Sequence, residues 1–142
     1  MGRVIKVLRE LIQSGFGDKE GYNCAQKIFY GANQVYELGL SEESLNLSAG
    51  FGGGAAVGEL CGALCGAVMV LSHLYGNESD KKSKRLKLAI EELLTNYQAE
   101  MGSIQCRYLK ADYRTPEKKC LVVIEKAAEL LDQKYEEFKL GQ

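Results

Sequence analysis

Residues 59–74 read ELCGALCGAVMVLSHL, and this segment decides how the fold is interpreted. Small and apolar side chains dominate it, and no Asp, Glu, Lys or Arg follows Glu59. Its longest apolar stretch, residues 63–71, is about half the length of a bilayer span and contains Gly66. The segment therefore predicts a small-residue helix of a folded domain that stops near Gly76, and it predicts no membrane insertion.

Most of the remaining sequence also places apolar side chains at helical spacing, which predicts further helices on both sides of this segment. Thr115 followed by Pro116 indicates the start of the last helix, because proline favours the first helical position. No alternating run predicts a strand, so the sequence predicts an all-α, compact bundle of five to seven helices with a glycine-rich loop. The predicted N-caps are Asn23, Ser41, Asn77 and Ser103. The expected helices cover approximately residues 4–15, 23–36, 41–47, 59–74, 77–102, 103–109 and 115–138.

The composition is typical of one soluble globular domain. The chain has 142 residues, of which 46% are apolar and 26% are charged, and this excludes a fully disordered chain. The length predicts a single helical domain over residues 1–142. A net charge of −1 gives no indication of nucleic-acid binding. The basic run at residues 81–87 is followed by Glu91 and Glu92, which is typical of a solvated helix face.

The first residues, MGRVIKVLRELIQ, lack the apolar core and the cleavage site of a secretory signal. We therefore expect a cytoplasmic protein, and thiols are normally reduced in that compartment. The chain contains five cysteines, so at least one of them must stay unpaired. Redox chemistry or metal binding is consequently favoured over a static disulfide framework.

Four of the cysteines share a position relative to the expected helices. Cys24 follows the predicted cap Asn23, and the other three lie within the first two turns of separate helices. Backbone amides and the helix dipole favour negative charge there, so we expect lowered thiol pKa values and stabilised thiolates. These four candidate site residues are Cys24, Cys61, Cys106 and Cys120.

The fifth cysteine, Cys65, forms a C-x-x-x-C pair with Cys61 within one helix. Residues four apart share a helix face with Cβ atoms about 5–6 Å apart. A disulfide requires about 3.8 Å, so a relaxed helix does not favour a bond between these two. Shared metal binding, or disulfides to other helices, fit this spacing better.

A glycine tract precedes Cys61 and is the second candidate feature. Residues 50–55 formally match the G-x-G-x-x-A pattern, but the residues before them predict a helix, whereas a dinucleotide fingerprint follows a strand. We interpret the tract as a flexible turn where the backbone passes close to another helix. Such a turn also lets backbone amides approach a ligand, so Gly52, Gly53 and Gly54 are candidate cofactor-binding residues.

The order of Cys24, the segment CGALCG at residues 61–66, Cys106 and Cys120 resembles the C_GCAxxG_C_C family of small redox-active proteins. The resemblance runs from about residue 21 to residue 131. It implies a site built from the same four cysteines. Cys65 occupies a variable position of the family pattern and is an extra thiol.

Three functions are consistent with these observations. The first is thiol–disulfide exchange or electron transfer by a thiol oxidoreductase. Cys61 would be the attacking thiolate, and Cys24, Cys106 or Cys120 would resolve the mixed disulfide. Cys65 would be a reserve thiol or a metal-side thiol. The partner would be a redox protein or a small thiol.

The second function is a metal site in which Cys24, Cys61, Cys106 and Cys120 bind zinc or an iron–sulfur cluster. The third is a non-catalytic helical interaction module, which a homodimer would suit, whose cysteines are core residues.

Overall fold

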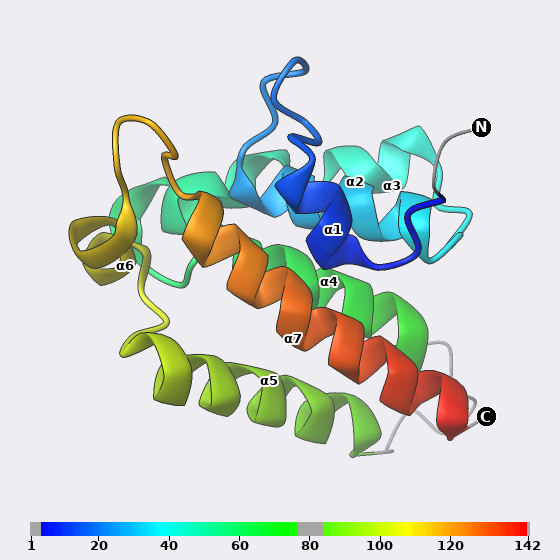
Figure 1. The fold of residues 1–142 in the computed structure, drawn as a ribbon. Helices are drawn as coiled ribbons and strands as arrows, with labels where there is room; N and C mark the ends of the chain where they lie inside the picture. The colour runs from blue at the N-terminus through cyan, green and yellow to red at the C-terminus, as the bar shows by residue number, and fades with distance from the viewer. Residues whose placement is uncertain (1–3, 77–83, 142) are drawn as a thin grey trace.

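The computed structural model describes residues 4–76 and 84–141 of the chain. These residues form seven α-helices and contain no strand, which confirms the predicted all-α fold (Figure 1). Two short helical turns, the 3-10 helix η1 and the π-helix η2, lie between α3 and α4. The elements are α1 (Leu8–Gln13), α2 (Cys24–Val35), α3 (Glu42–Asn46), η1 (Ala49–Phe51), η2 (Gly54–Gly58), α4 (Gly62–Gly76), α5 (Arg85–Met101), α6 (Cys106–Tyr113) and α7 (Leu121–Leu140).

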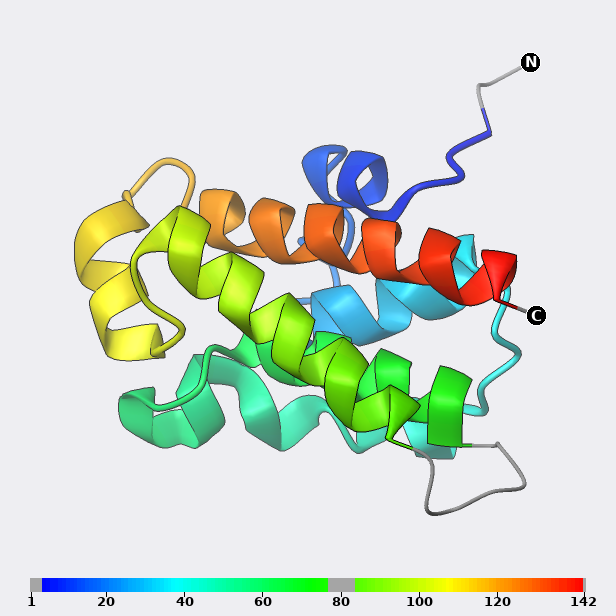
Figure 2. The ribbon, with the colours of Figure 1, turned by 90° about the horizontal axis from the view of Figure 1, so that it is seen from below.

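Helix α4 is the central helix of the bundle. It packs against α2, α5 and α7, while α1 covers α2 and α7 on the other side (Figure 1). Seen from below, α5 and α7 run beside each other along the bundle (Figure 2). None of the helices in the described ranges combines the length and apolar character that a membrane crossing requires.

Small residues on α4 allow α2 to approach very closely. Ala63 and Ala67 of α4 and Ala25 of α2 are fully buried. A Cβ atom on Gly66 would lie 2.7 Å from the carbonyl oxygen of Ala25 and 3.0 Å from the Cβ atom of Ile28. The glycine therefore removes the side chain that would otherwise separate the two helices.

Two predicted caps are confirmed. The Asn23 side chain accepts a hydrogen bond from the Gln26 amide at 3.0 Å, and the Gln26 side chain accepts one from the Asn23 amide at 2.9 Å. This is a capping box, which satisfies two backbone donors at the start of α2. Ser41 likewise caps α3 through the Ser44 amide. The predicted cap at Asn77 lies outside the described residues.

Four helix starts differ from the prediction. Helix α4 begins at Gly62 instead of near Glu59, because the backbone of residues 59–61 pairs with that of residues 104–106. The last helix begins at Leu121 because Thr115 and Lys119 pair through two backbone hydrogen bonds of 3.2 and 2.7 Å in a tight turn. Lys119 has φ +52°, a left-handed conformation that interrupts a helix. Helix α6 begins at Cys106, because the Ser103 hydroxyl accepts its hydrogen bond from the amide of Gln105 and no helix starts there. Helix α1 begins at Leu8, four residues after the start expected from Val4.

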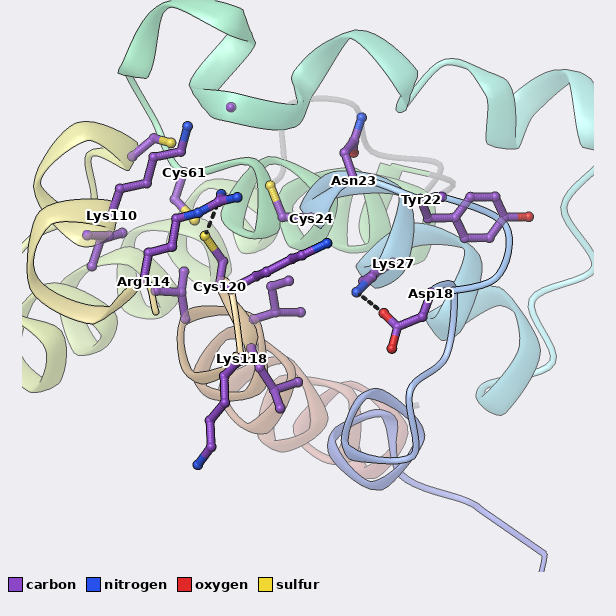
Figure 3. A pocket seen from close by; sticks show the side chains of 18 of the residues that line it. Asp18, Tyr22, Asn23, Cys24, Lys27, Cys61, Lys110, Arg114, Lys118 and Cys120 are labelled. Atoms are coloured by element: carbon purple, nitrogen blue, oxygen red, sulfur yellow. Dashed lines mark hydrogen bonds and ion pairs between the residues drawn. The ribbon is translucent and has the colours of Figure 1, made fainter. Parts of the chain in front are cut away.

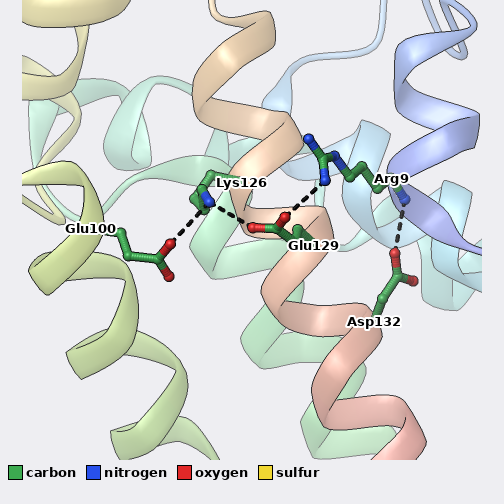
Figure 4. A network of polar contacts seen from close by, with 5 residues as sticks. All are labelled: Arg9, Glu100, Lys126, Glu129 and Asp132. Atoms are coloured by element: carbon green, nitrogen blue, oxygen red, sulfur yellow. Dashed lines mark hydrogen bonds and ion pairs between the residues drawn. The ribbon is translucent and has the colours of Figure 1, made fainter.

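Helix α1 receives its N-terminal cap from α7. The carboxylate of Asp132 accepts hydrogen bonds from the backbone amides of Leu8 at 2.8 Å and Arg9 at 3.0 Å, and from the Tyr36 hydroxyl at 2.5 Å. Figure 4 shows the hydrogen bond from the Arg9 amide to Asp132 next to the ion pair between Arg9 and Glu129. One side chain thus satisfies donors from α1 and from the end of α2, and so joins three elements.

We expect Gly66→Ala to lower the free energy of unfolding by about 1–3 kcal/mol, because the added methyl group collides with the backbone of α2. Urea denaturation followed by circular dichroism measures this change. The matched control is Gly50→Ala, where a Cβ atom meets no other atom within 4 Å. Equal stability of the two variants would contradict close α2–α4 packing at Gly66.

We expect Asp132→Ala to cost about 1–3 kcal/mol, because the amides of Leu8 and Arg9 lose their acceptor. The same denaturation experiment measures the loss, and hydrogen exchange should show faster exchange at these two amides. Asp112→Ala, a change at an exposed position on α6, is the control. Unchanged exchange at Leu8 would show that Asp132 does not cap α1.

Candidate functional site

The starts of four helices meet at one pocket of 680 Å³. Its lining includes the four cysteines expected there, and Figure 3 shows the side chains of Cys24, Cys61 and Cys120 directed into it. Cys24 and Cys106 are the first residues of α2 and α6, whereas Cys61 and Cys120 directly precede α4 and α7. The tertiary structure therefore brings together four residues that are up to 96 positions apart in the sequence.

A short antiparallel bridge fixes Cys61 and Cys106 next to each other. Leu60 and Gln105 pair across it. The amide of Cys61 donates to the carbonyl of Ile104 at 2.8 Å, and the amide of Cys106 donates to the carbonyl of Glu59 at 2.6 Å. The starts of α4 and α6 are consequently held in register by their backbones, independently of any bond between the sulfur atoms.

The position after Cys61 has no space for a side chain, which explains the glycine at residue 62. A Cβ atom at this position would collide with the Cys24 Sγ atom and would lie 2.8 Å from the carbonyl oxygen of Phe51. The missing side chain thus leaves the space that the Cys24 sulfur occupies. Gly62 and Gly66 together set the position of α2, and with it the position of Cys24 beside Cys61.

The glycine tract folds into η1 and η2, and it follows helix α3. Gly53 lines the pocket. Gly52 packs against the side chain of Asn23, and a Cβ atom on Gly54 would lie 2.8 Å from the Cys106 Cβ atom. Two of the three candidate glycines therefore provide space for neighbouring elements, and Gly53 is the one in contact with the pocket.

Ala55 and Ala56 have φ values of +57° and +69°, a conformation that side chains disfavour. Arg107 holds this segment from α6. Its guanidinium donates to the carbonyls of Gly58 at 3.1 Å and Val57 at 3.2 Å and forms an ion pair with Glu59. The unfavourable backbone of η2 is thereby fixed against the helix that carries Cys106.

Burial dominates the pKa values of the two buried thiols, Cys61 and Cys106. The Cys61 residue is 3% exposed, and desolvation raises its pKa to about 12. The charge of Cys24 raises this pKa further, and the amides of Leu64 and Ala63 lower it. The helix start therefore acts in the expected direction, but the predicted net lowering is wrong for Cys61 because desolvation is larger.

Cys106 follows the same pattern. Desolvation raises its pKa, and the charges of Cys24 and Cys120 act in the same direction. The side chains of Lys110 and Arg114 oppose this effect but do not overcome it. The predicted lowering is thus also wrong for Cys106. The pKa of Cys61 thus responds to Cys24 and Cys106, and the pKa of Cys106 responds to Cys24 and Cys120.

The family described as "Putative redox-active protein (C_GCAxxG_C_C)" matches residues 22–134. The chain belongs to this family. The match includes all four pocket cysteines and confirms the resemblance found in the sequence. Comparisons with curated proteins and with solved structures give no match.

The extra thiol in this C_GCAxxG_C_C member does not line the pocket. Cys65 is half-buried on α4, and its Sγ atom donates to the carbonyl of Leu60 at 3.7 Å. Desolvation raises its pKa, with a further contribution from Cys24. Of the five predicted site cysteines, the structure therefore brings four together at the pocket, and Cys65 is not among the lining residues.

The metal hypothesis finds no geometric support. Across residues 4–76 and 84–141, no three His, Cys, Asp or Glu side chains are arranged to bind one metal ion. All five cysteines are free thiols in this structure.

Sequence reasoning missed the cationic side chains of the pocket. Lys110 lies on α6 and Arg114 directly follows the last residue of this helix, and the Arg114 guanidinium donates to the Cys120 Sγ atom at 3.7 Å (Figure 3). A spacing of four residues brings side chains together only within a helix, and Arg114 lies beyond the end of α6, so this spacing alone could not place it. Lys118 and Lys119 could not be placed because the turn that carries them was predicted as helix.

We expect iodoacetamide to alkylate Cys24 and Cys120 of the reduced, native protein before Cys61, because both are half-buried whereas Cys61 is buried. At pH 8 a thiol of pKa about 12 is ionised to roughly one part in ten thousand. Only the thiolate reacts, so labelling of Cys61 should still rise about tenfold per pH unit between pH 8 and pH 10.

Mass spectrometry of digested samples measures the labelling at each cysteine. The same reaction in urea is the control, because unfolding should remove the difference among the sites. Labelling of native Cys61 as fast as Cys120 at pH 8 would contradict the burial of its thiol.

Proposed function

We propose that this protein carries out thiol–disulfide redox chemistry at the four-cysteine pocket, as an oxidoreductase of the reducing cytoplasm. One observation carries the proposal: four cysteines from four separate helix starts line a single pocket. Family membership supports redox activity in general. The partner would be a redox protein or a small thiol, since either can supply or accept the two electrons of a disulfide.

Cys24 and Cys61 form the first candidate pair. The Cys24 sulfur occupies the space that a side chain would fill at Gly62, the residue that follows Cys61. The charge of Cys24 also raises the pKa of Cys61. An attacking thiol must be accessible, and Cys24 is the more exposed member. Cys24 is therefore the attacking thiol and Cys61 the resolving one, which reverses the attacking role expected for Cys61 from the sequence.

Cys120 and Cys106 repeat this arrangement. Cys120 is half-buried and accepts the hydrogen bond from Arg114, whereas Cys106 is buried and responds to the charge of Cys24 and, less strongly, to that of Cys120. The pocket thus contains two pairs, each with one accessible and one buried thiol. Either pair, or both in succession, can hold a disulfide.

The proposed reaction transfers two electrons. The Cys24 thiolate attacks one sulfur of a substrate disulfide, forming a mixed disulfide and releasing the first substrate thiolate. Cys61 then attacks the Cys24 sulfur, its proton passes to the departing second thiolate, and a Cys24–Cys61 disulfide remains. Two protein thiols are oxidised and one substrate disulfide is reduced to two thiols.

Anaerobic equilibration of the protein in dithiothreitol redox buffers tests the first pair. We expect a reversible two-electron oxidation in which peptide mapping finds Cys24 bonded to Cys61. Cys24→Ser and Cys61→Ser should each abolish this disulfide, because each removes one of its sulfur atoms. Cys65→Ser is the matched control and should keep it, because Cys65 lies outside the pocket.

Two results would contradict the proposal. Thiols that all stay reduced in oxidising buffer would favour a non-catalytic helical module. Native mass spectrometry of anaerobically purified protein that found zinc or an iron–sulfur cluster, lost from a Cys61→Ser variant, would favour the metal site.

A further inference from the structure

Uncompensated positive charge surrounds the four-cysteine pocket. Its lining contains five cationic and two anionic side chains, whereas the whole chain has a net charge of −1. Lys27 is paired with Asp18 at 2.6 Å (Figure 3). In the part of the chain that the structure describes, the other four cationic groups have no carboxylate oxygen within 4 Å. These four are Lys110, Arg114, Lys118 and Lys119.

The charges act on the sulfur atoms themselves. Arg114 donates to Cys120 Sγ at 3.7 Å, and both Lys110 and Arg114 counteract the effect of burial on Cys106. Lys118 and Lys119 are on the tight turn that directly precedes Cys120. Helix α6 and the segment that follows it therefore contribute positive charge to the lining of the pocket that holds the thiols.

The size of the pocket favours a small substrate. A volume of 680 Å³ falls within the range of about 300–1,000 Å³ that is typical of small-molecule sites. A positively charged, partly enclosed pocket raises the local concentration of anions and the rate at which they associate. The volume favours a small substrate, and the positive charge favours an anionic one.

We infer that the pocket takes a small disulfide carrying carboxylate or other anionic groups. Four cationic side chains of the lining, here called the cationic rim, draw it toward the pocket thiols: Lys110, Arg114, Lys118 and Lys119. This inference rests on the proposed thiol–disulfide chemistry and adds its substrate class. The anionic disulfide is the oxidant: it accepts two electrons from two pocket thiols, leaves as two anionic thiols, and the protein keeps one disulfide.

A matched series of symmetric disulfides tests the inference in a single turnover. Fully reduced, full-length protein is mixed with disulfides of 2-carboxyethanethiol, 2-sulfoethanethiol, 2-hydroxyethanethiol or 2-aminoethanethiol, which differ only in the terminal group. Loss of protein thiols is followed by quenched mass spectrometry. Because intrinsic reactivity differs within the series, each rate is compared between the native protein and its variants with the same disulfide.

The test variant is Lys110→Gln/Lys118→Gln, which removes two positive charges from the pocket lining and no side-chain hydrogen bond or ion pair among the residues that the structure describes. We expect the rates with the carboxylate and sulfonate disulfides to fall about fivefold, and to fall in the native protein as ionic strength rises. The rate with the neutral disulfide should not change. An unchanged neutral rate shows that the substitutions leave the reactivity of the thiols intact. Lys6→Gln/Lys87→Gln, with the same change in net charge away from the pocket, is the control and should retain every rate.

The outcomes distinguish a wrong substrate class from a wrong redox function. A fall with the sulfonate equal to that with the carboxylate supports attraction by charge, and a fall confined to the carboxylate supports specific recognition of that group. Unchanged anionic rates in the rim variant would overturn the inference and leave the redox function standing. A protein disulfide that reacts faster than every small one, and is insensitive to the rim variant, would also overturn it. No oxidation by any disulfide would overturn the proposed function itself.

Discussion

The close contact between α2 and α4 is the constraint on which the site depends. Gly62 and Gly66 remove two side chains from one face of α4, so that the backbone of α2 and the Cys24 sulfur can occupy their space. Small residues a turn apart allow this because they repeat on one face of a helix. The same two positions therefore determine both the packing of the bundle centre and the distance between Cys24 and the start of α4.

The remaining thiols are positioned by backbone contacts. The bridge between Leu60 and Gln105 joins the start of α6 to the start of α4, and the turn before Leu121 places Cys120 across from them. Helix starts are polar and cannot be buried without partners for their amides. In this fold the partners are a neighbouring carbonyl at Cys61 and at Cys106, so the chain can gather several helix ends around one pocket.

Local patterns in the sequence predict much of this architecture. The all-α fold, the caps at Asn23 and Ser41, and the helix-start placement of the cysteines depend on residues close in sequence. The tight turn before α7 depends on pairing of Thr115 with Lys119, which overrides the helix signal of Pro116. The raised pKa of Cys61 could not be predicted either, because burial is a property of the assembled bundle and outweighs the local amides.

The unequal burial of the thiols is consistent with a division of labour. Disulfide exchange needs one thiol that a substrate can reach and a second that reacts only after the mixed disulfide has formed. A buried thiol with a raised pKa, such as Cys61, stays protonated and is protected from external oxidants until then. Its proton is also available for the departing thiolate at the moment of resolution. Burial keeps the Cys61 thiol protonated. A protonated thiol is a poor first nucleophile, but it supplies the proton that the second step requires.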